Sequence, residues 1–564
     1  MVDVGAMNVC RLWSRAWLYE RKHIYSHTDS SGVWPKRTPT CRIESGGVEP
    51  MPEAAGGSLD GRLKYVAFAG LGLSMLLGAV DQTIVATALP SIATDLGSLD
   101  QVFWVVTAYL ITSTAVTPLY GKISDVYGRR RLTQIAIVVF LVGSVLSGVS
   151  GSMLQLAVFR GLQGVGAGGL MAMAMAGIGD IFTARERGKY MSYLQLVNGT
   201  AIMAGPLFGG FLTDHFTWRW IFYVNLPLSL LALALVQVAL DVPVPSENHR
   251  IDYEGAGLLV VAVSALVAVA SWGGSRYAWT SLPTLGLAAV TVLSTVLFLV
   301  QERRTEEPMV SLGLFRNRSV LLITVLSVLL GGVMLGVINY VPVFMKTVLE
   351  ESGVNTGALL IPFTLGSIGS AVLAGQLMSR LGRYKTLTVA GLLTTMVGCY
   401  LLSTMGADVS LLQTAVYMFI TGTIGMTGPT LATAIQNAVS GNDIGEVSSL
   451  YSFARNLGEA LGVSAFGIVF NRHLTAELSD VLPTGVDPST VSESPQVIQQ
   501  LSPQLQQQVI SALVNAFHDV FLFGVALLGV ALVASLALPN LDLKEESGAE
   551  QRAAVHDTPV ESED

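Results

Sequence analysis

Charged residues are scarce in this chain: Asp, Glu, Lys and Arg together make up only 13% of its 564 residues. Ordinary soluble domains carry about 25%, so this composition excludes a typical water-soluble enzyme. Cysteine is also scarce, because only Cys10, Cys41 and Cys399 occur, and they are widely separated. Their spacing predicts neither a disulfide framework nor a metal site.

Motifs of nucleotide and catalytic chemistry are missing as well. The sequence contains no GxxxxGK[ST] loop, which argues against ATP-driven transport by this chain, and no HExxH zinc motif. It also lacks a convincing nucleophile motif. We therefore expect no enzyme activity, no cofactor and no metal.

Apolar residues, in contrast, make up 51% of the chain, and the mean hydropathy is +0.57. About 20 consecutive apolar residues cross a bilayer as a helix, and only helices or closed barrels satisfy the backbone there. Because the alternating pattern of barrel strands is absent, we predict an all-α integral membrane protein. Fourteen transmembrane helices are expected, at residues 65–89, 102–120, 132–150, 153–177, 190–213, 220–240, 255–272, 281–300, 319–343, 356–379, 386–404, 410–434, 448–470 and 516–538.

Basic residues fall mainly in alternate loops between these spans. One set of loops holds fifteen Lys and Arg, and the opposite set holds four. Short cytoplasmic loops carry the excess of basic residues. Both termini and the turn at 121–131 are therefore predicted to be cytoplasmic, with the protein in the plasma (inner) membrane. The basic set comprises loops 121–131, 180–189, 241–254, 301–318 and 380–385.

The spans also predict the organisation of the chain. Six helices within 61–240 and six within 319–540 are expected to form two bundles. Residues 241–318 would link them and add two extra transmembrane helices. Paired bundles of this kind are common in secondary transporters.

Three further segments lie outside the predicted spans. Residues 1–60 are either a disordered cytoplasmic extension or the result of a start placed too early, with Met51 as the alternative. The long outer loop 471–515 has apolar residues at helical spacing in its second part, which predicts a helix that extends the last span. The acidic tail 541–564 is expected to be disordered and cytoplasmic.

A short basic turn occurs twice. GKISDVYGRRR at 121–131 returns in degraded form as GQLMSRLGRYK at 375–385. General basicity of cytoplasmic loops would explain the arginines, but not the glycines at matching offsets. Gly121 lets one helix end approach another closely, and Gly128 permits a tight turn. The repetition indicates a protein built from two related halves.

The two copies differ in their acidic residue. Asp125 is the only acid in the first copy, and Ser379 stands in its place in the second. An acid at this position can face the positive N-terminal end of a neighbouring helix and pair with a nearby arginine.

Two charges lie well inside predicted spans: Asp81 in LLGAVDQTIVATALP and Arg160 in LAVFRGLQGVGAGGL. A charge at the bilayer centre costs about 2.5–3.5 kcal/mol on insertion scales, so it marks a functional site by default. Asp81 could load and release protons, or it could be paired permanently with Arg160. The residues alone leave both possibilities open.

Residues 198–210, NGTAIMAGPLFGG, predict a helix that packs closely and bends. Trp218 and Trp220, which follow, are predicted to anchor the chain at the membrane interface. The residues expected to shape the helix are Gly199, Gly205, Pro206, Gly209 and Gly210.

In RNLGEALG at 455–462, Arg455 and Glu459 are four residues apart and share one helical face. Two interpretations are open. The two residues neutralise each other as an ion pair, or Glu459 is a second protonatable group that recruits cationic substrate. We also expect the substrate cavity to be lined by Asp81, Asn198, Asn339, Arg455 and Glu459.

Together these patches, over 77–227 with the echo at 375–385, resemble the signature motifs of the major facilitator superfamily, specifically its fourteen-helix drug:proton antiporter branch. The resemblance implies a monomer with the major facilitator fold that works by alternating access. It implies that the glycines and proline of 198–210 are a sign of antiport. At position 459 this chain departs from the family, which commonly has a small residue where Glu459 stands. The gating latch that it implies consists of Gly121, Asp125, Gly128 and Arg129, and the proton-coupling set consists of Asp81, Arg160 and Glu459.

The function expected from this resemblance is proton-coupled export of hydrophobic, often cationic drugs or toxins. Its partners would be protons, membrane lipid and small substrates, and not nucleic acid. Two other hypotheses remain open: an exporter of lipids or other amphiphiles on the same fold, and a membrane sensor that transports nothing. The sequence offers no attached signalling domain for the last of these.

Overall fold

The computed structural model describes residues 61–96, 103–240, 252–273, 277–305, 308, 310–349, 360–478, 503–540, 543–544 and 546. The chain divides into Met1–Ala55 and Gly56–Asp564, and the described residues all belong to the second unit. The expectations for 1–60, for most of the outer loop and for most of the acidic tail therefore lie outside the described residues.

The first half of the chain forms a group of helices that pack mainly against one another. Helix α5 contacts both α3 and α4, and α2 contacts both α6 and α8. This first helix group consists of α2 (Gly61–Leu96), α3 (Phe103–Tyr127), α4 (Arg129–Gly148), α5 (Met153–Ile181), α6 (Ala184–His215), α7 (Trp220–Tyr223) and α8 (Asn225–Ala239).

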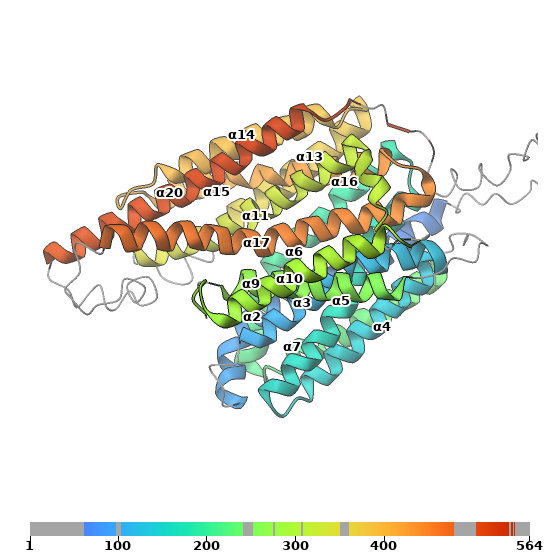
Figure 1. Ribbon diagram of the computed structural model, residues 1–564, viewed down its shortest axis with the longest axis horizontal. Coiled ribbons are helices and arrows are strands. Elements are labelled where there is room, and N and C mark those ends of the chain that lie inside the picture. The colour runs from blue at the N-terminus through green and yellow to red at the C-terminus, as the bar shows by residue number, and fades with distance from the viewer. Residues whose placement is uncertain are drawn as a thin grey trace, which may run out of the picture. The chain divides into compact units, whose positions relative to one another are not determined.

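The second half forms a corresponding group, in which α17 packs along α11 and α20 lies against α14. Figure 1 shows the two groups meeting along α6 and α17, and α6 contacts α13 while α17 contacts α3. The second helix group consists of α11 (Arg318–Thr347), α13 (Leu360–Leu381), α14 (Lys385–Ser403), α15 (Leu411–Thr421), η3 (Gly422–Met426), α16 (Thr427–Asn437), α17 (Ile444–Leu478) and α20 (Pro503–Leu536).

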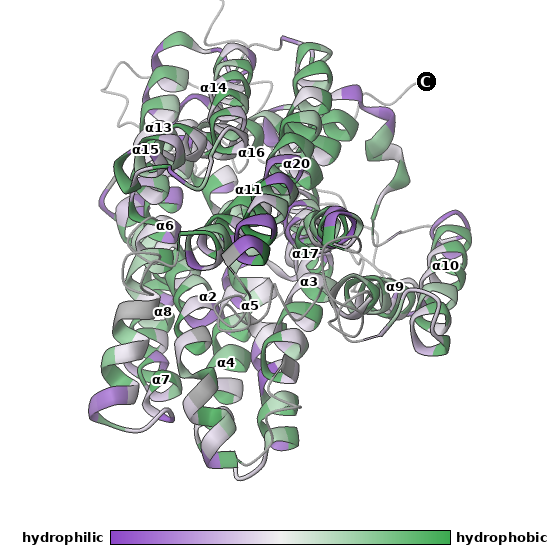
Figure 2. Cartoon of the chain, turned by 90° about the vertical axis from the view of Figure 1, so that its left-hand side faces the viewer, coloured by the Kyte–Doolittle hydropathy of each residue, from purple (hydrophilic) through white to green (hydrophobic). Residues whose placement is uncertain are grey.

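Two linker helices, α9 (Tyr253–Trp272) and α10 (Leu282–Glu302), lie between the groups in sequence. Helix α9 contacts α3 and α17, and it separates α10 from them (Figure 2). The outer face of α10 is apolar, with Val292 and Leu293 more than half exposed. Such a face suits contact with lipid rather than water.

Helix boundaries follow local chemistry. The Thr183 side chain accepts from the backbone N–H of Glu186, whose carboxylate returns to Thr183, so a capping box starts α6. Ser410 and Gln413 start α15 in the same way. Where α14 meets the end of α20, the Lys385 ammonium donates to the carbonyl oxygens of Leu536 and Leu538, which satisfies groups that a helix terminus leaves open.

The expected all-helical architecture is confirmed. Among the described residues, eleven helices are long and apolar enough to cross a membrane. The remaining three expected spans coincide with α3, with α17 and with the α15–η3–α16 segment. The loop helix predicted before the last span is also present, because α20 begins at Pro503.

Two expectations were wrong in detail. The predicted continuous span at 410–434 contains a 3₁₀ stretch at Gly422–Met426. There Gly422 and Gly425 lie directly on carbonyl oxygens of α13, so the close approach of two backbones locally distorts the helix. Trp218, predicted to be an interfacial anchor, is buried to 4% exposure, whereas Trp220 is 50% exposed.

Candidate functional site

The two charges expected inside the first helix group meet there. Asp81 on α2 and Arg160 on α5 are 0% and 1% exposed, and an Arg160 guanidinium nitrogen donates to Oδ2 of Asp81 at 2.5 Å. The other carboxylate oxygen, Oδ1, accepts from the amides of Gln163 at 2.8 Å and Asn225 at 3.1 Å. We call these four residues the buried acid cluster.

Three side chains, those of Arg160, Gln163 and Asn225, donate to the Asp81 carboxylate. A charge this deeply buried is tolerable because it is paired and hydrogen-bonded on both oxygens. A proton that arrives at Asp81 therefore competes with Arg160 for the carboxylate. Proton loading at this position requires that the contact between the two side chains open.

Gln163 and Asn225 were missed by the sequence analysis. Gln163 lies three residues after Arg160 on the same helical face, and its Oε1 accepts from Arg160 at 2.8 Å. Asn225 begins the apolar helix α8, and its amide also donates to Ser144. An isolated amide residue at the start of an apolar helix was the available signal.

The repeated turn places its first copy between the two helix groups. Gly121 on α3 lies so close to α17 that a Cβ there would overlap Ser449 and the Gly445 carbonyl oxygen. Asp125 and Arg129 face Gly445 at the start of α17, and they pair with each other. The acid thus faces a helix N-terminus, as predicted from its position. Gly128 has φ 89°, which favours glycine.

Arg129 has a second acid partner that the sequence did not indicate. Its Nε donates to Oδ2 of Asp180, at the end of α5, at 2.9 Å. Arg129 and Asp180 are 3% and 1% exposed. The arginine therefore ties α4 to α5 while it contacts the Asp125 carboxylate of α3.

The second copy makes the matching contact. A Cβ at Gly375 on α13 would overlap Ser192 and the Gly188 carbonyl oxygen of α6. Gly188 and Ser192 are four residues apart, as are Gly445 and Ser449, and Gly382 has φ 67°. Each half therefore presents a Gly-x-x-x-Ser face to the glycine of the other half.

At the other end of α2, Asp95 joins the α6–α7 connection. Its carboxylate accepts from the Trp218 indole at 3.0 Å and from Arg219 at 2.9 Å. These two donors lower the pKa of Asp95. The hydrogen bond to Asp95 also explains why Trp218 is buried rather than exposed at an interface.

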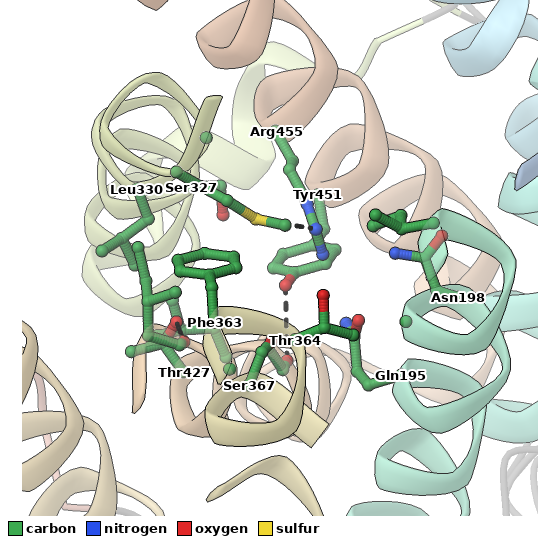
Figure 3. A pocket seen from close by; sticks show the side chains of 18 residues that line it. Gln195, Asn198, Ser327, Leu330, Phe363, Thr364, Ser367, Thr427, Tyr451 and Arg455 are labelled. Carbon is green, nitrogen blue, oxygen red and sulfur yellow. Dashed lines mark hydrogen bonds between the residues drawn. The ribbon is translucent and has the colours of Figure 1, made fainter. Parts of the chain in front are cut away.

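Two polar pockets lie between the helix groups. The arginine pocket has a volume of about 50 Å³ and includes Arg455, Tyr451, Gln195 and Asn198 (Figure 3). The glutamate pocket has a volume of about 90 Å³ and includes Glu459, Gln82 and Tyr109. Ligand pockets usually measure about 300–1,000 Å³, so both pockets are small for a ligand in this structure.

One ion pair separates these pockets. The Arg455 Nε donates to Oε1 of Glu459 at 3.1 Å, and both side chains are partly exposed. Yet Arg455 lines one pocket and Glu459 lines the other. Arg455 also donates to the Met334 sulfur, and the Tyr451 hydroxyl donates to the Gly428 carbonyl oxygen (Figure 3).

The buried acid cluster touches the wall of the glutamate pocket without opening into it. The Arg160 guanidinium lies 4.1 Å from the Tyr109 ring centre, and the Tyr109 hydroxyl donates to the Gly78 carbonyl oxygen at 3.1 Å. Tyr109 and Gly78 line the pocket. Movement of Arg160 would therefore change the contacts of Tyr109, a residue that lines the glutamate pocket.

The structure places some of the expected cavity residues at the two pockets and others away from them. Asn198, Arg455 and Glu459 line the two pockets, whereas Asp81 and Asn339 line neither of them. Asp81 is enclosed by its own helix group, and the Asn339 amide donates to the Leu335 carbonyl oxygen of its own helix.

The 198–210 motif lies on α6 and packs on two sides. A Cβ at Gly205 or Gly209 would overlap α2, and one at Gly199 would overlap Ile368 of α13. Gly210 has open space beside it. The side chain of Pro206 lies outside the described part of the structure. The motif therefore sits where α2, α6 and α13 approach one another.

Within the described ranges, no group of three or more His, Cys, Asp or Glu side chains could hold a metal ion. The charges and polar pockets instead lie inside or between two repeat-related groups of membrane-type helices. This arrangement defines a multi-pass membrane transporter.

The chain belongs to the Major Facilitator Superfamily, whose family model matches residues 71–463. It is 32% identical over 511 residues to the multidrug transporter protein MdtP of Bacillus subtilis, covering 86% of this chain and 94% of that protein. Multidrug resistance protein 3 of the same species is 32% identical over 503 residues, covering 87% and 98%. The efflux pump FUS6 of Gibberella fujikuroi is 29% identical over 519 residues, covering 89% and 93%.

Solved structures show the same fold. The proton:xylose symporter XylE with a bound bromodeoxyglucose matches 87% of this chain and 99% of its own, with a TM-score of 0.56 at 17% identity. The human organic anion transporter MFSD10 matches 82% and 99%, with a TM-score of 0.54 at 14% identity. The predicted family membership is confirmed.

Proposed function

We propose that this protein is a proton-coupled antiporter that exports hydrophobic, often cationic small molecules by alternating access. The names of its relatives, a multidrug transporter and a multidrug resistance protein, support the cargo class. The observation that carries the coupling is the buried acid cluster, because a buried and fully hydrogen-bonded Asp81 next to a displaceable arginine can exchange one positive charge for another.

The expected topology forms part of the proposal. Fourteen helices would span the plasma membrane, as six-helix bundles over 61–240 and 319–540 with two linker helices in 241–318. Both termini would be cytoplasmic, and the protein would act as a monomer. The unequal distribution of basic residues between the two sets of loops supports this orientation.

In this mechanism a proton reaches Asp81 and displaces Arg160. The guanidinium already lies against the Tyr109 ring, which lines the glutamate pocket, so its release from Asp81 would leave a positive charge without its acid partner beside that pocket. A positive charge released toward that pocket disfavours a cationic substrate near Glu459. Proton loading and substrate release would thus be linked through one side chain.

The driving force limits the stoichiometry. One charge crossing 100 mV is worth about 2.3 kcal/mol, and one pH unit is worth about 1.4 kcal/mol. Exchange of one proton for a neutral molecule could use both, whereas exchange for a monocation uses only the pH difference. Strong accumulation of cations would need a second proton, which Glu459 could carry.

The coupling is tested in proteoliposomes under an imposed pH gradient, with ethidium as the cationic cargo. Asp81→Asn should abolish the gradient-driven flux. Asp95→Asn is the matched control, because Asp95 is an acid on the same helix that is exposed at the end of α2. Equal flux in wild type and Asp81→Asn, with the gradient still required, would remove Asp81 from the coupling.

The same vesicles distinguish the other hypotheses. A fluorescent phospholipid that is moved in place of ethidium would make the protein a lipid exporter. A membrane sensor would produce no gradient-dependent flux with any cargo. For the role of Glu459, the change Glu459→Gln should reduce export of a cation more than export of a neutral molecule, and equal loss would contradict that role.

A further inference from the structure

A third cavity lies away from the two polar pockets and shares no lining residue with them. It encloses about 270 Å³ between the linker helices α9 and α10 and the helices α3 and α17. An apolar cavity of about 150 Å³ can already hold benzene. The third cavity is therefore large enough for a longer hydrocarbon group, and it is larger than either central pocket.

The lining of this cavity is almost entirely hydrocarbon. Leu259 and Val263 of α9, Phe298 of α10 and Phe453 of α17 contribute to it. Its one acidic residue, Glu446, is already occupied: the carboxylate accepts from the Ser311 backbone and hydroxyl and lies 3.8 Å from Lys122. Besides Glu446, only the hydroxyl residues Thr295 and Ser449 add polar groups to the described lining, so a hydrocarbon chain suits the cavity better than a polar substrate.

The cavity borders the surface that faces lipid. Leu299 of α10 lines it and still exposes 39% of its own surface. Helix α10 packs against α9, and its outer face is exposed and apolar (Figure 2). A chain can therefore enter from the hydrocarbon of the bilayer without crossing water.

Exposed arginines follow the lining residues of the same cavity in sequence, in a segment that also contains Glu302, Glu306 and Glu307. Arg303 and Arg304 are exposed and directly follow α10, and Arg303 is four residues after Leu299, or about 6 Å of helix rise. Arg316 is exposed and directly follows Phe315, another lining residue. Arginines at a membrane surface attract anionic lipid head groups.

From this combination we infer that the third cavity binds one acyl chain of an anionic phospholipid, whose phosphate contacts the arginines beside it. The site lies against Pro118 of α3 and Ser449 of α17, close to Gly121, where those two helices meet. A bound lipid would therefore stabilise the conformation in which α3 and α17 are in contact.

The test uses the full-length protein in nanodiscs and phosphatidylglycerol with a diazirine on one acyl chain. Phosphatidylcholine with the same chains is the comparison probe. We expect labelling of the α9 and α17 segments that line the cavity, roughly tenfold stronger with phosphatidylglycerol. Equal labelling by both lipids, or labelling spread evenly over the outer face of α10, would overturn the proposal.

Two sets of variants make the test specific. Ala262→Phe fills the cavity and should abolish labelling of its lining, whereas Val292→Phe, on the exposed face of α10, should not. The double change Arg303→Gln with Arg304→Gln leaves the cavity intact and should reduce phosphatidylglycerol labelling to the phosphatidylcholine level. Labelling that survives both changes, or that a transported drug displaces while lipid does not, would contradict a lipid site.

Discussion

At the residue scale, the important property of Asp81 is that its two oxygens have different partners. Oδ2 contacts a charged group, Arg160, while Oδ1 contacts two neutral amides, Gln163 and Asn225. The arginine can leave without stripping the carboxylate of all its hydrogen bonds. In the proposed mechanism, the two amides keep their contacts with Oδ1 when a proton replaces the guanidinium.

This division leads to a prediction for Gln163→Leu. The change removes one hydrogen-bond donor to the Asp81 carboxylate, which is worth about 1.5–3 kcal/mol, and it leaves the Asn225 amide as the remaining donor to Oδ1. If Asp81 carries the coupled proton, as proposed, the midpoint of the pH dependence of transport should differ between the variant and the wild type. Transport in proteoliposomes over pH 5.5–9 measures it, and a lower rate with an unchanged midpoint would mean that Gln163 is only structural.

Asp95 should have no such effect on the pH dependence of transport. Trp218 and Arg219 lower its pKa, so its favourable contribution is complete at neutral pH and is lost only as pH falls below the ordinary aspartate range near 4. Asp95→Asn should leave the pH dependence of transport between 5.5 and 8 unchanged. Because the pair is exposed, the melting temperature should fall by no more than about 2 °C, and a shifted pH profile would contradict this assignment.

At the element scale, contacts between the halves depend on matched glycines. Gly121 meets Gly445 and Ser449, and Gly375 meets the equally spaced Gly188 and Ser192. A side chain at either first position would collide with a backbone carbonyl oxygen, which cannot rotate away. The helices of the two halves can approach this closely only because these positions lack a Cβ.

The prediction is that Gly121→Ala shifts the protein away from the conformation seen here. Spin labels on the ends of α3 and α17 should report a longer distance between these helices, by double electron–electron resonance in nanodiscs. Gly210→Ala, on α6 with open space beside it, is the control and should leave the distance unchanged. An unaltered distance in both variants would contradict the prediction, because it would show that the α3–α17 contact accommodates the added methyl group.

Sequence reasoning predicted the helices and the repeated turn because their signals are local. Apolar runs predicted the spans, and the offsets of Gly121 and Gly375 predicted the repeat. It missed Asn225 and Asp180 because their partners lie on other helices, far away in sequence. It failed for Trp218 because a tryptophan near a helix end suits an interface unless a distant acid binds its indole.

At the scale of the whole molecule, the two copies of the turn make similar steric contacts but different electrostatic ones. Asp125 faces the N-terminal end of α17 together with Arg129. In the second copy the backbone oxygen of Ser379 accepts from Arg185 at 3.0 Å. Lys122 of α3 also lies 3.8 Å from Glu446 of α17, so the α3–α17 contact has a charge on both partners, whereas this α6–α13 contact has a charge on one partner only.

Asp125→Asn should consequently weaken the α3–α17 contact while keeping its shape. An acid at a helix N-terminus contributes about 0.3–1 kcal/mol, so the population of the present conformation should fall roughly two- to fivefold relative to the alternative. Distance distributions between spin labels on α3 and α17 measure it. Ser379→Ala is the control, and an equal effect of both changes would contradict the asymmetry.

This difference between the copies gives the rocking motion an order of events. With one seam held by charge and sterics and the other mainly by sterics, the α6–α13 seam should part first, and the α3–α17 seam should act as the last hinge. Added salt screens the α3–α17 contact, which has charge on both partners, more than the α6–α13 contact, so raising ionic strength should bring the two separations closer together in time. A transporter built from two nearly equal halves would then open asymmetrically, with one of its two contacts between the halves separating before the other.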